Sequence, residues 1–117
     1  LTEKRLSVTA QRLARAREAL DFYTNLTIDG HVSIKADRSA IPMGILVKVP
    51  EEIRLRIVRS VLGHMGDGGY GPRLETLEDR LVEFFRDTAK AKRFTLGGFL
   101  FSHDRKAGVF TIIRETQ

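Results

Sequence analysis

Few residues in this chain have the spacing that catalytic or metal-binding chemistry requires. The three histidines, His31, His64 and His103, do not have the spacing of a metal-binding motif, and no cysteine is present to join them. Ser102 and His103 are neighbours on an expected strand, where adjacent side chains point to opposite faces, so they do not form a nucleophile and its base. The sequence therefore predicts no catalytic residue, no bound metal and no cofactor in this chain.

Glycine pairs and paired carboxylates offer no better candidate. Gly68-Gly69 and Gly97-Gly98 lack the strand–loop–helix context, and the lysine, of a phosphate-binding loop. Glu51 and Glu52 directly follow Pro50, which suits the first turn of a helix, where carboxylates favour the positive end of the dipole. We interpret them as charges at a helix start.

The candidates that remain are basic side chains. The net charge is +5; residues 1–20 carry five basic groups against two acidic ones, and residues 86–106 carry six against two, so the middle of the chain is slightly acidic. Positive charge concentrated at the two ends points to a polyanionic partner. The predicted RNA-binding residues are Arg12, Arg15, Arg73, Lys90, Lys92, Arg93, Arg105 and Lys106. If the first helix packs near the end of the chain, these residues form one continuous basic surface.

Three helical patterns would position these groups. From Thr2 to about Tyr23, apolar residues recur every three or four positions, which predicts a helix with one buried stripe (Leu6, Ala10, Leu13, Ala16, Leu20 and Tyr23) and a basic ridge on another side (Lys4, Arg5, Arg12 and Arg15). A second helix is predicted from Pro50 to a left-handed stop at Gly66. After a glycine-rich linker over residues 67–71, a third begins at Pro72 and ends near Thr88. Its net charge is negative, so we expect Arg80 and Arg86 to contribute little to binding a polyanion.

Two segments have strand character. Residues 31–35 alternate polar and apolar side chains, and Asp37 to Ser39 read as a turn; the structure of residues 36–49 is left open because an apolar run fits a strand or a short helix equally well. Residues 93–114 contain two β-rich runs around a turn and predict one hairpin. Gly97-Gly98 is interpreted as a kink, a bulge or a close backbone approach in its first strand. A hairpin needs cover from other elements, and we expect Leu74, Leu77, Leu81 and Phe84 to pack on it.

Together these elements predict an α+β fold that is mainly helical, with three principal helices, a short strand and a C-terminal β-hairpin. The 117 residues suit a single accessory domain, and we expect it to be a fragment of a longer chain. Cysteine is absent, which is compatible with a reducing compartment, and no apolar run is long enough for a membrane span.

Several stretches, taken together, resemble one protein family. They are Arg5-Leu6, Arg12-Leu13-Ala14-Arg15-Ala16, Val49-Pro50-Glu51-Glu52, Gly69-Tyr70-Gly71-Pro72-Arg73 and Thr95-Leu96-Gly97-Gly98. This combination is similar to the region that follows the catalytic domain in tRNA(Ile)-lysidine synthetase, a PP-loop ATPase. The most specific parts are the Tyr-x-Pro-Arg helix start and the Thr-Leu-Gly-Gly stretch.

The resemblance implies a division of labour. In that family an upstream domain with a Ser-Gly-Gly-x-Asp-Ser loop uses ATP and magnesium to adenylate the wobble cytidine of an isoleucine tRNA, and lysine then attacks. No such loop occurs in this sequence. The resemblance therefore implies a non-catalytic tRNA-recognition region of a cytoplasmic, tRNA-modifying ligase, whose partners are tRNA and its own upstream catalytic domain.

Two other interpretations start from the same residues. Helix, strand, helix, helix and hairpin is also the element order of a winged-helix DNA-binding domain, although its third helix is acidic here where a groove-reading helix needs neutral or positive residues. The other is a non-catalytic protein-interaction domain, for which the basic charge is incidental.

The absence of a phosphate loop leads to a direct test. We expect the purified 117-residue chain to show no ATP–pyrophosphate exchange, because it has neither the loop nor a set of metal ligands. Turnover above that of a heat-treated control would contradict this expectation.

Overall fold

The computed structural model describes residues 2–66 and 73–115. The elements follow in the order α1 (Glu3–His31), β1 (Ser33–Ile34), β2 (Arg38–Pro42), α2 (Met43–Lys48), α3 (Glu51–Met65), α4 (Leu74–Arg86), β3 (Phe94–Leu96), β4 (Phe99–Asp104) and β5 (Val109–Arg114). The fold is α+β and mainly helical, as predicted. It contains one short helix, α2, in addition to the three that were predicted, and its sheet is larger than expected. The glycine-rich linker and the predicted helix start at Pro72 lie outside the described residues.

The strands form one antiparallel sheet in the order β1-β2-β5-β4-β3. β2 extends the C-terminal strands, since Ile41 lies opposite Phe110 on β5. The prediction of a turn at residues 37–39 was wrong in part, because Arg38 and Ser39 already belong to β2. The sequence left the structure of residues 36–49 undecided. Strand β2 ends at Pro42, and helix α2 begins with Met43, which is buried together with Leu46.

The glycine pair at 97–98 is a turn, so the prediction of a kink within one strand was wrong. Gly97 and Gly98 both have positive φ, at 59° and 83°, and they join Leu96 to its partner Phe99 across a two-residue hairpin loop. Such a loop requires left-handed backbone at both central positions, which glycine adopts without a steric penalty. The expected single hairpin is therefore three strands, β3, β4 and β5.

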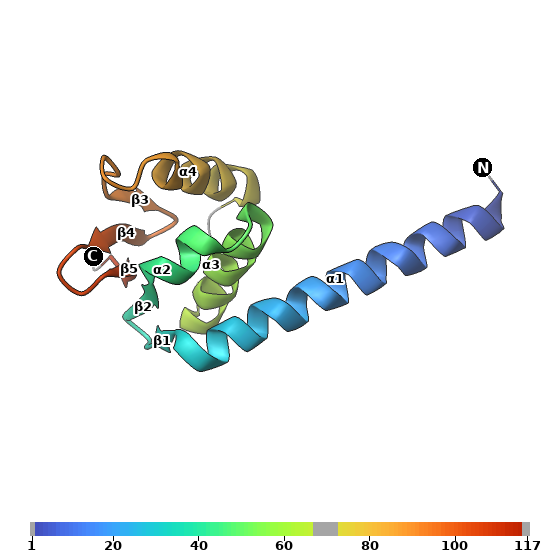
Figure 1. The fold of residues 1–117 in the computed structure, drawn as a ribbon, viewed down its shortest axis with the longest axis horizontal. Coiled ribbons are helices and arrows are strands. Elements are labelled where there is room, and N and C mark those ends of the chain that lie inside the picture. Colours follow the sequence, from blue (N-terminus) through green and yellow to red (C-terminus); the bar gives the residue numbers. More distant parts are fainter. Residues whose placement is uncertain (1, 67–72, 116–117) are drawn as a thin grey trace.

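The core lies between one face of this sheet and the helices (Figure 1). α4 covers the C-terminal strands through Phe84, whose ring meets that of Phe110 edge-on at 5.2 Å and that of Phe94 at 5.9 Å. Phe94 stacks in turn on Phe101, with centroids 4.7 Å apart. The predicted core shared by the third helix and the hairpin is confirmed for Leu77, Leu81 and Phe84, which are buried in one cluster with Phe99 and Phe101.

Leu74 is the exception, because it begins α4 on the solvent side and is 44% exposed. The third helix is also shorter than predicted and ends at Arg86. The second helix matches its prediction. Its apolar stripe is buried, and Gly66 ends it with a left-handed φ of 74°.

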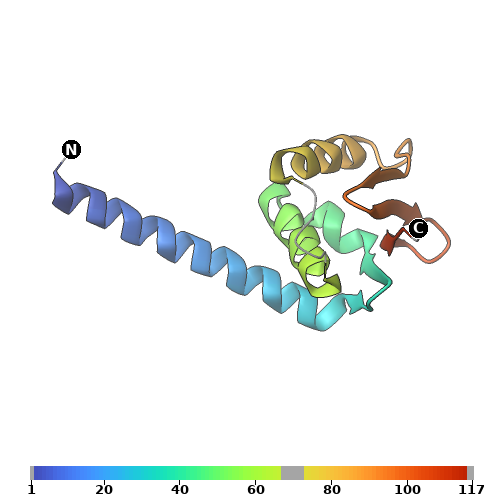
Figure 2. The ribbon, with the colours of Figure 1, turned by 180° about the vertical axis from the view of Figure 1, so that it is seen from behind.

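α1 differs most from its prediction. It continues to His31, so the strand predicted over residues 31–35 is limited to Ser33 and Ile34. Only the part of α1 from Leu20 onward packs on the body, through buried Thr24 and Ile28 and half-buried Leu20. The earlier part projects away from all the other described elements (Figures 1 and 2). The predicted buried stripe is therefore wrong for its N-terminal half, since a helix stripe is buried only where another element lies against it. It is wrong for Tyr23 as well, which is 49% exposed because it lies about 100° around the helix from buried Thr24.

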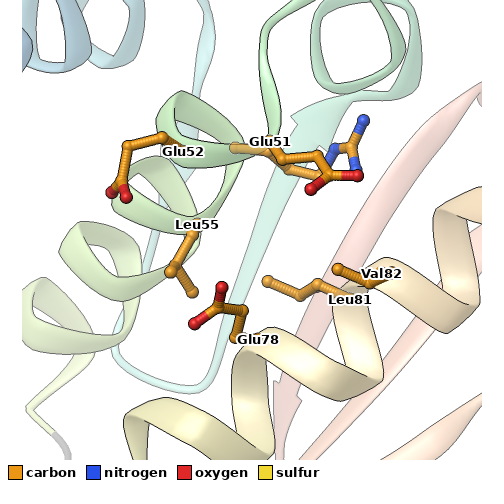
Figure 3. Close-up of a pocket in the computed structure, with 7 residues that line it drawn as sticks. Glu51, Glu52, Leu55, Glu78, Leu81 and Val82 are labelled. Carbon is orange, nitrogen blue, oxygen red and sulfur yellow. The ribbon is translucent and has the colours of Figure 1, made fainter.

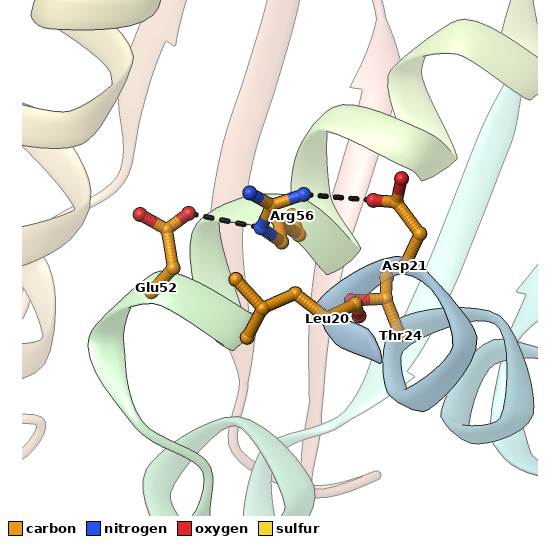
Figure 4. Close-up of polar contacts among 5 residues, drawn as sticks. All are labelled: Leu20, Asp21, Thr24, Glu52 and Arg56. Atoms are coloured by element: carbon orange, nitrogen blue, oxygen red, sulfur yellow. Dashed lines mark hydrogen bonds and ion pairs between the residues drawn. The ribbon is translucent and has the colours of Figure 1, made fainter. Parts of the chain in front are cut away.

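One ionic contact joins α1 to α3 at the point where α1 leaves the body (Figure 4). The guanidinium of Arg56 donates to Asp21 of α1 at 2.7 Å and to Glu52 of its own helix at 3.1 Å. Leu20 and Thr24 lie beside this contact. Apolar packing and an ion pair together set the direction in which α1 projects.

The core predicts the effect of truncating α4. Leu81→Ala is expected to lower the free energy of unfolding by about 2 to 5 kcal/mol, because it removes a side chain that is only 2% exposed and leaves a cavity. Leu74→Ala, on the same helix, should change it by less than about 1 kcal/mol. Urea denaturation of both variants measures the difference. Equal midpoints for the two would contradict this description of the core.

Candidate nucleic-acid interface

All eight predicted RNA-binding residues are exposed, but they lie on three separate parts of the molecule. Arg12 and Arg15 belong to the projecting part of α1. Arg73 directly precedes α4. The other five lie in two neighbouring connections, residues 87–93 between α4 and β3 and residues 105–108 between β4 and β5 (Lys90, Lys92, Arg93, Arg105 and Lys106).

An aspartate organises each of these two connections. Asp104 Oδ1 accepts the backbone N–H groups of Lys106 and Ala107, both at 3.1 Å, and its carbonyl accepts from Gly108 at 2.8 Å. Asp87 has the same role in the other connection. Its Oδ1 accepts a hydrogen bond from the backbone N–H of Ala89, and its backbone carbonyl accepts one from the N–H of Lys90, each at 3.1 Å. The acidic residues in this basic window therefore stabilise the turns that present the cations.

Arg105 connects the two turns. Its Nη2 donates to the carbonyls of Thr88, at 3.2 Å, and Ala89, at 3.3 Å. Sequence analysis predicts Arg105 as a ligand-binding cation, whereas the structure uses part of its guanidinium to hold residues 88–89 against the β4–β5 turn. The basic residues of the two connections, 87–93 and 105–108, are in this way held close together in space.

A hollow of about 420 Å³ lies between the end of α4 and the connection that follows it. We call it the basic hollow. Its walls carry five cations and two carboxylates, and the side chains of Phe84, Ala91 and Phe94 supply apolar surface (Arg80, Arg86, Lys90, Lys92 and Arg93; Glu83 and Asp87). Because Phe84 is only 4% exposed and Phe94 stacks on Phe101, what the basic hollow offers a ligand is mainly its cations, which can bind phosphates.

Arg80 and Arg86 are the residues that sequence reasoning missed. The net negative charge of the third helix predicts little contribution from them, but the structure places both at the basic hollow beside Lys90. The signal available in the sequence was their spacing around Glu83, three residues on either side, which keeps them near one side of a helix. The net charge of a helix does not tell which charges share a face.

The N-terminal cations do not join this surface. α1 meets the body beside β1, at the opposite edge of the sheet from β3, and its N-terminal part runs away from β3 and β4 in both views (Figures 1 and 2). The condition for one continuous basic surface, that the first helix packs near the hairpin, is not met. Within the described residues, the cations of α1 and the basic hollow are therefore separate basic surfaces.

A second recess, a cleft of about 160 Å³ between α3 and α4, has the opposite character (Figure 3). Glu51, Glu52 and Glu78 line it, so it repels phosphate. Arg54 also borders it. Burial lowers the pKa of this guanidinium, and Glu51 partly counteracts the shift by raising the pKa.

Arg54 has a structural role in this cleft. Its Nε donates to the carbonyl of Leu46 at 2.9 Å, and its guanidinium lies 4.3 Å from the ring centre of Phe85. It thereby joins α2, α3 and α4.

In residues 2–66 and 73–115, no three histidine or acidic side chains lie close enough to hold a metal ion.

None of the helices in the described part of the chain combines the length and apolarity that crossing a membrane requires. These residues form a small, mainly helical α+β domain whose notable surfaces are a basic hollow and a projecting basic helix. No family model matches the sequence, and no solved structure matches it.

A curated protein does match. The chain is similar to tRNA(Ile)-lysidine synthase of Ruegeria pomeroyi, with 37% identity over 79 residues. These residues are 67% of this chain but span only 19% of that protein's length. The resemblance to tRNA(Ile)-lysidine synthetase that the motifs carry is confirmed: the chain is related to a part of that enzyme.

The contacts of Arg105 predict how the basic hollow is held together. In Arg105→Ala, the backbone amides of Ala89 and Lys90 are expected to exchange with solvent roughly five to ten times faster, because two hydrogen bonds to that segment are lost. Hydrogen exchange followed by NMR measures this. Lys106→Ala, which removes a neighbouring cation, serves as the control and should leave these amides unchanged; equal acceleration in both variants would show that Arg105 does not hold the segment.

Proposed function

We propose that this chain is the tRNA-binding accessory region of a tRNA(Ile)-lysidine synthetase, and that the basic hollow binds the tRNA backbone. The observation that carries the proposal is the gathering of five cations around one recess from two successive segments, α4 and residues 87–93. Affinity for RNA comes largely from neutralised phosphates, and exposed lysines and arginines around a recess supply it. The relationship to a tRNA(Ile)-lysidine synthase supports tRNA as the ligand.

The catalytic steps belong elsewhere in this proposal. ATP, magnesium and lysine would bind an upstream catalytic domain, because the sequence has no phosphate loop. The region described here would hold the tRNA so that the wobble cytidine reaches that domain. The proposed partners are thus tRNA and the enzyme's own catalytic domain, and the proposed location is the cytoplasm.

Charge reversal at the basic hollow tests the proposal. Lys90, Lys92 and Arg93 changed together to Glu are expected to weaken tRNA binding by the full-length enzyme and to flatten its salt dependence. The slope of log K against log salt is negative, and each lost phosphate contact should make it less steep by about 0.9 for a duplex and about 0.7 for a single strand. Fluorescence anisotropy with labelled tRNA at several salt concentrations gives both quantities.

The matched control reverses three exposed cations outside the basic hollow and causes the same change in net charge (Lys35, Lys48 and Arg59). It should lower affinity much less, because long-range repulsion is screened beyond about 10 Å in 0.1 M salt. Equal losses in the two triple variants would refute the placement of the RNA surface. Higher affinity for duplex DNA than for tRNA would instead favour the winged-helix interpretation.

Arg80 and Arg86 form a separate arm of the same experiment. Because they line the basic hollow, reversing both should now weaken tRNA binding measurably, contrary to what the net charge of the helix predicts. The loss of tRNA affinity on reversing Arg80 and Arg86 is expected to exceed the loss on reversing any two of the three control residues.

A further inference from the structure

α1 carries a second exposed feature that the basic hollow does not explain. Phe22 is 70% exposed and Leu26, one turn later, is 64% exposed. At 100° per residue, both lie opposite the side of α1 that packs on α3, where Thr24 and Ile28 are buried. No further movement of α1 toward α3 would cover them.

The same side of the helix carries the N-terminal cations. We define the α1 stripe by Lys4, Arg5, Arg12, Arg15, Phe22 and Leu26, which fall within a sector of about 100°. From Lys4 to Phe22 it is about 27 Å long. The first part of the stripe is cationic, and the part that follows is aromatic and aliphatic.

No carboxylate of α1 falls in this sector. Glu3 and Asp21 lie on other sides of the helix, and Asp21 is paired with Arg56 at 2.7 Å. Glu18 and Asp29 border the sector at its Phe22 edge, about 40° and 20° outside it. A row of cations leading to an exposed phenylalanine is complementary to a chain of phosphates with an accessible base. A protein surface docking here would have to desolvate the cations or pair each with a carboxylate.

We propose that the α1 stripe is a second RNA-binding surface, on which Phe22 stacks an unpaired base while the cations of the preceding turns bind the phosphates beside it. The proposal rests on the tRNA-binding function proposed above and adds to it the kind of RNA element that this surface takes. Tyr23, half-exposed at the border of the stripe, is positioned to flank the same base. Stacking tolerates any base, so the surface selects unpaired structure over sequence.

The composition of the chain provides a specific reporter. It contains no tryptophan, so Phe22→Trp introduces a single indole at the proposed stacking position. A single-stranded RNA oligonucleotide is expected to quench its fluorescence, whereas inorganic polyphosphate, which occupies the cations without a base, is expected not to. The control is Leu13→Trp, at a similarly exposed position (64%) on the opposite side of the helix. Similar quenching at both positions, or by both polyanions, would overturn the proposal.

Affinities separate this proposal from the one on which it rests. Phe22→Ala should weaken binding of single-stranded RNA about tenfold and binding of a blunt RNA duplex by less than twofold, while Leu13→Ala leaves both unchanged. If Phe22→Ala binds normally but reversal of Lys90, Lys92 and Arg93 weakens binding, the stripe is refuted and the function of the basic hollow stands. If neither Phe22→Ala nor reversal of Lys90, Lys92 and Arg93 weakens RNA binding by the full-length enzyme, both proposals fall.

Discussion

The contact between α4 and the inner face of the C-terminal strands is the constraint on which the rest of this domain depends. An isolated ribbon of short strands is not stable in water, and Phe84 and Phe85 of α4 cover it by packing on Phe110. Once α4 is docked there, the chain has only residues 87–93 in which to return to the edge strand β3. The lysines and arginines of that connection are therefore gathered beside the arginines at the end of α4, which produces the basic hollow.

Part of the positive charge of this chain stabilises the fold, through four of its 20 lysines and arginines. Arg54 joins α2 to α4, Arg56 joins α1 to α3, and Arg105 joins two turns. Arg114, on β5, donates to the carbonyls of Met65 and Gly66 at the end of α3 and lies over the ring of Phe99. A guanidinium can satisfy several carbonyls at once, which suits it to such connections. The net charge of +5 therefore overstates what is available to a polyanion, and the distribution of the remaining cations carries the functional argument.

Two basic regions separated by the length of a helix suit a large ligand better than a small one. The domain measures 54 Å along its longest axis, most of it from α1, and the direction of α1 is set by Leu20, Thr24, Ile28 and the Arg56–Asp21 pair. Under the proposals made here, one RNA would contact both regions, and its affinity would depend on how firmly α1 is held. The acidic cleft between α3 and α4 would limit the positions that the RNA backbone can take.

The sequence by itself determined the local features of this protein: the α3 stripe and its stop at Gly66, the α+β class, and the relationship to tRNA(Ile)-lysidine synthetase. These follow from periodicity, capping chemistry and residue-level motifs, which depend on neighbours along the chain. Only the tertiary structure decided that the leucines of the N-terminal half of α1 are exposed, that residues 43–48 are helical and that Gly97-Gly98 is a turn. It also decided that Arg80 and Arg86 share a recess with Lys90, because an amphipathic pattern does not specify which elements face each other or which charges meet across a connection.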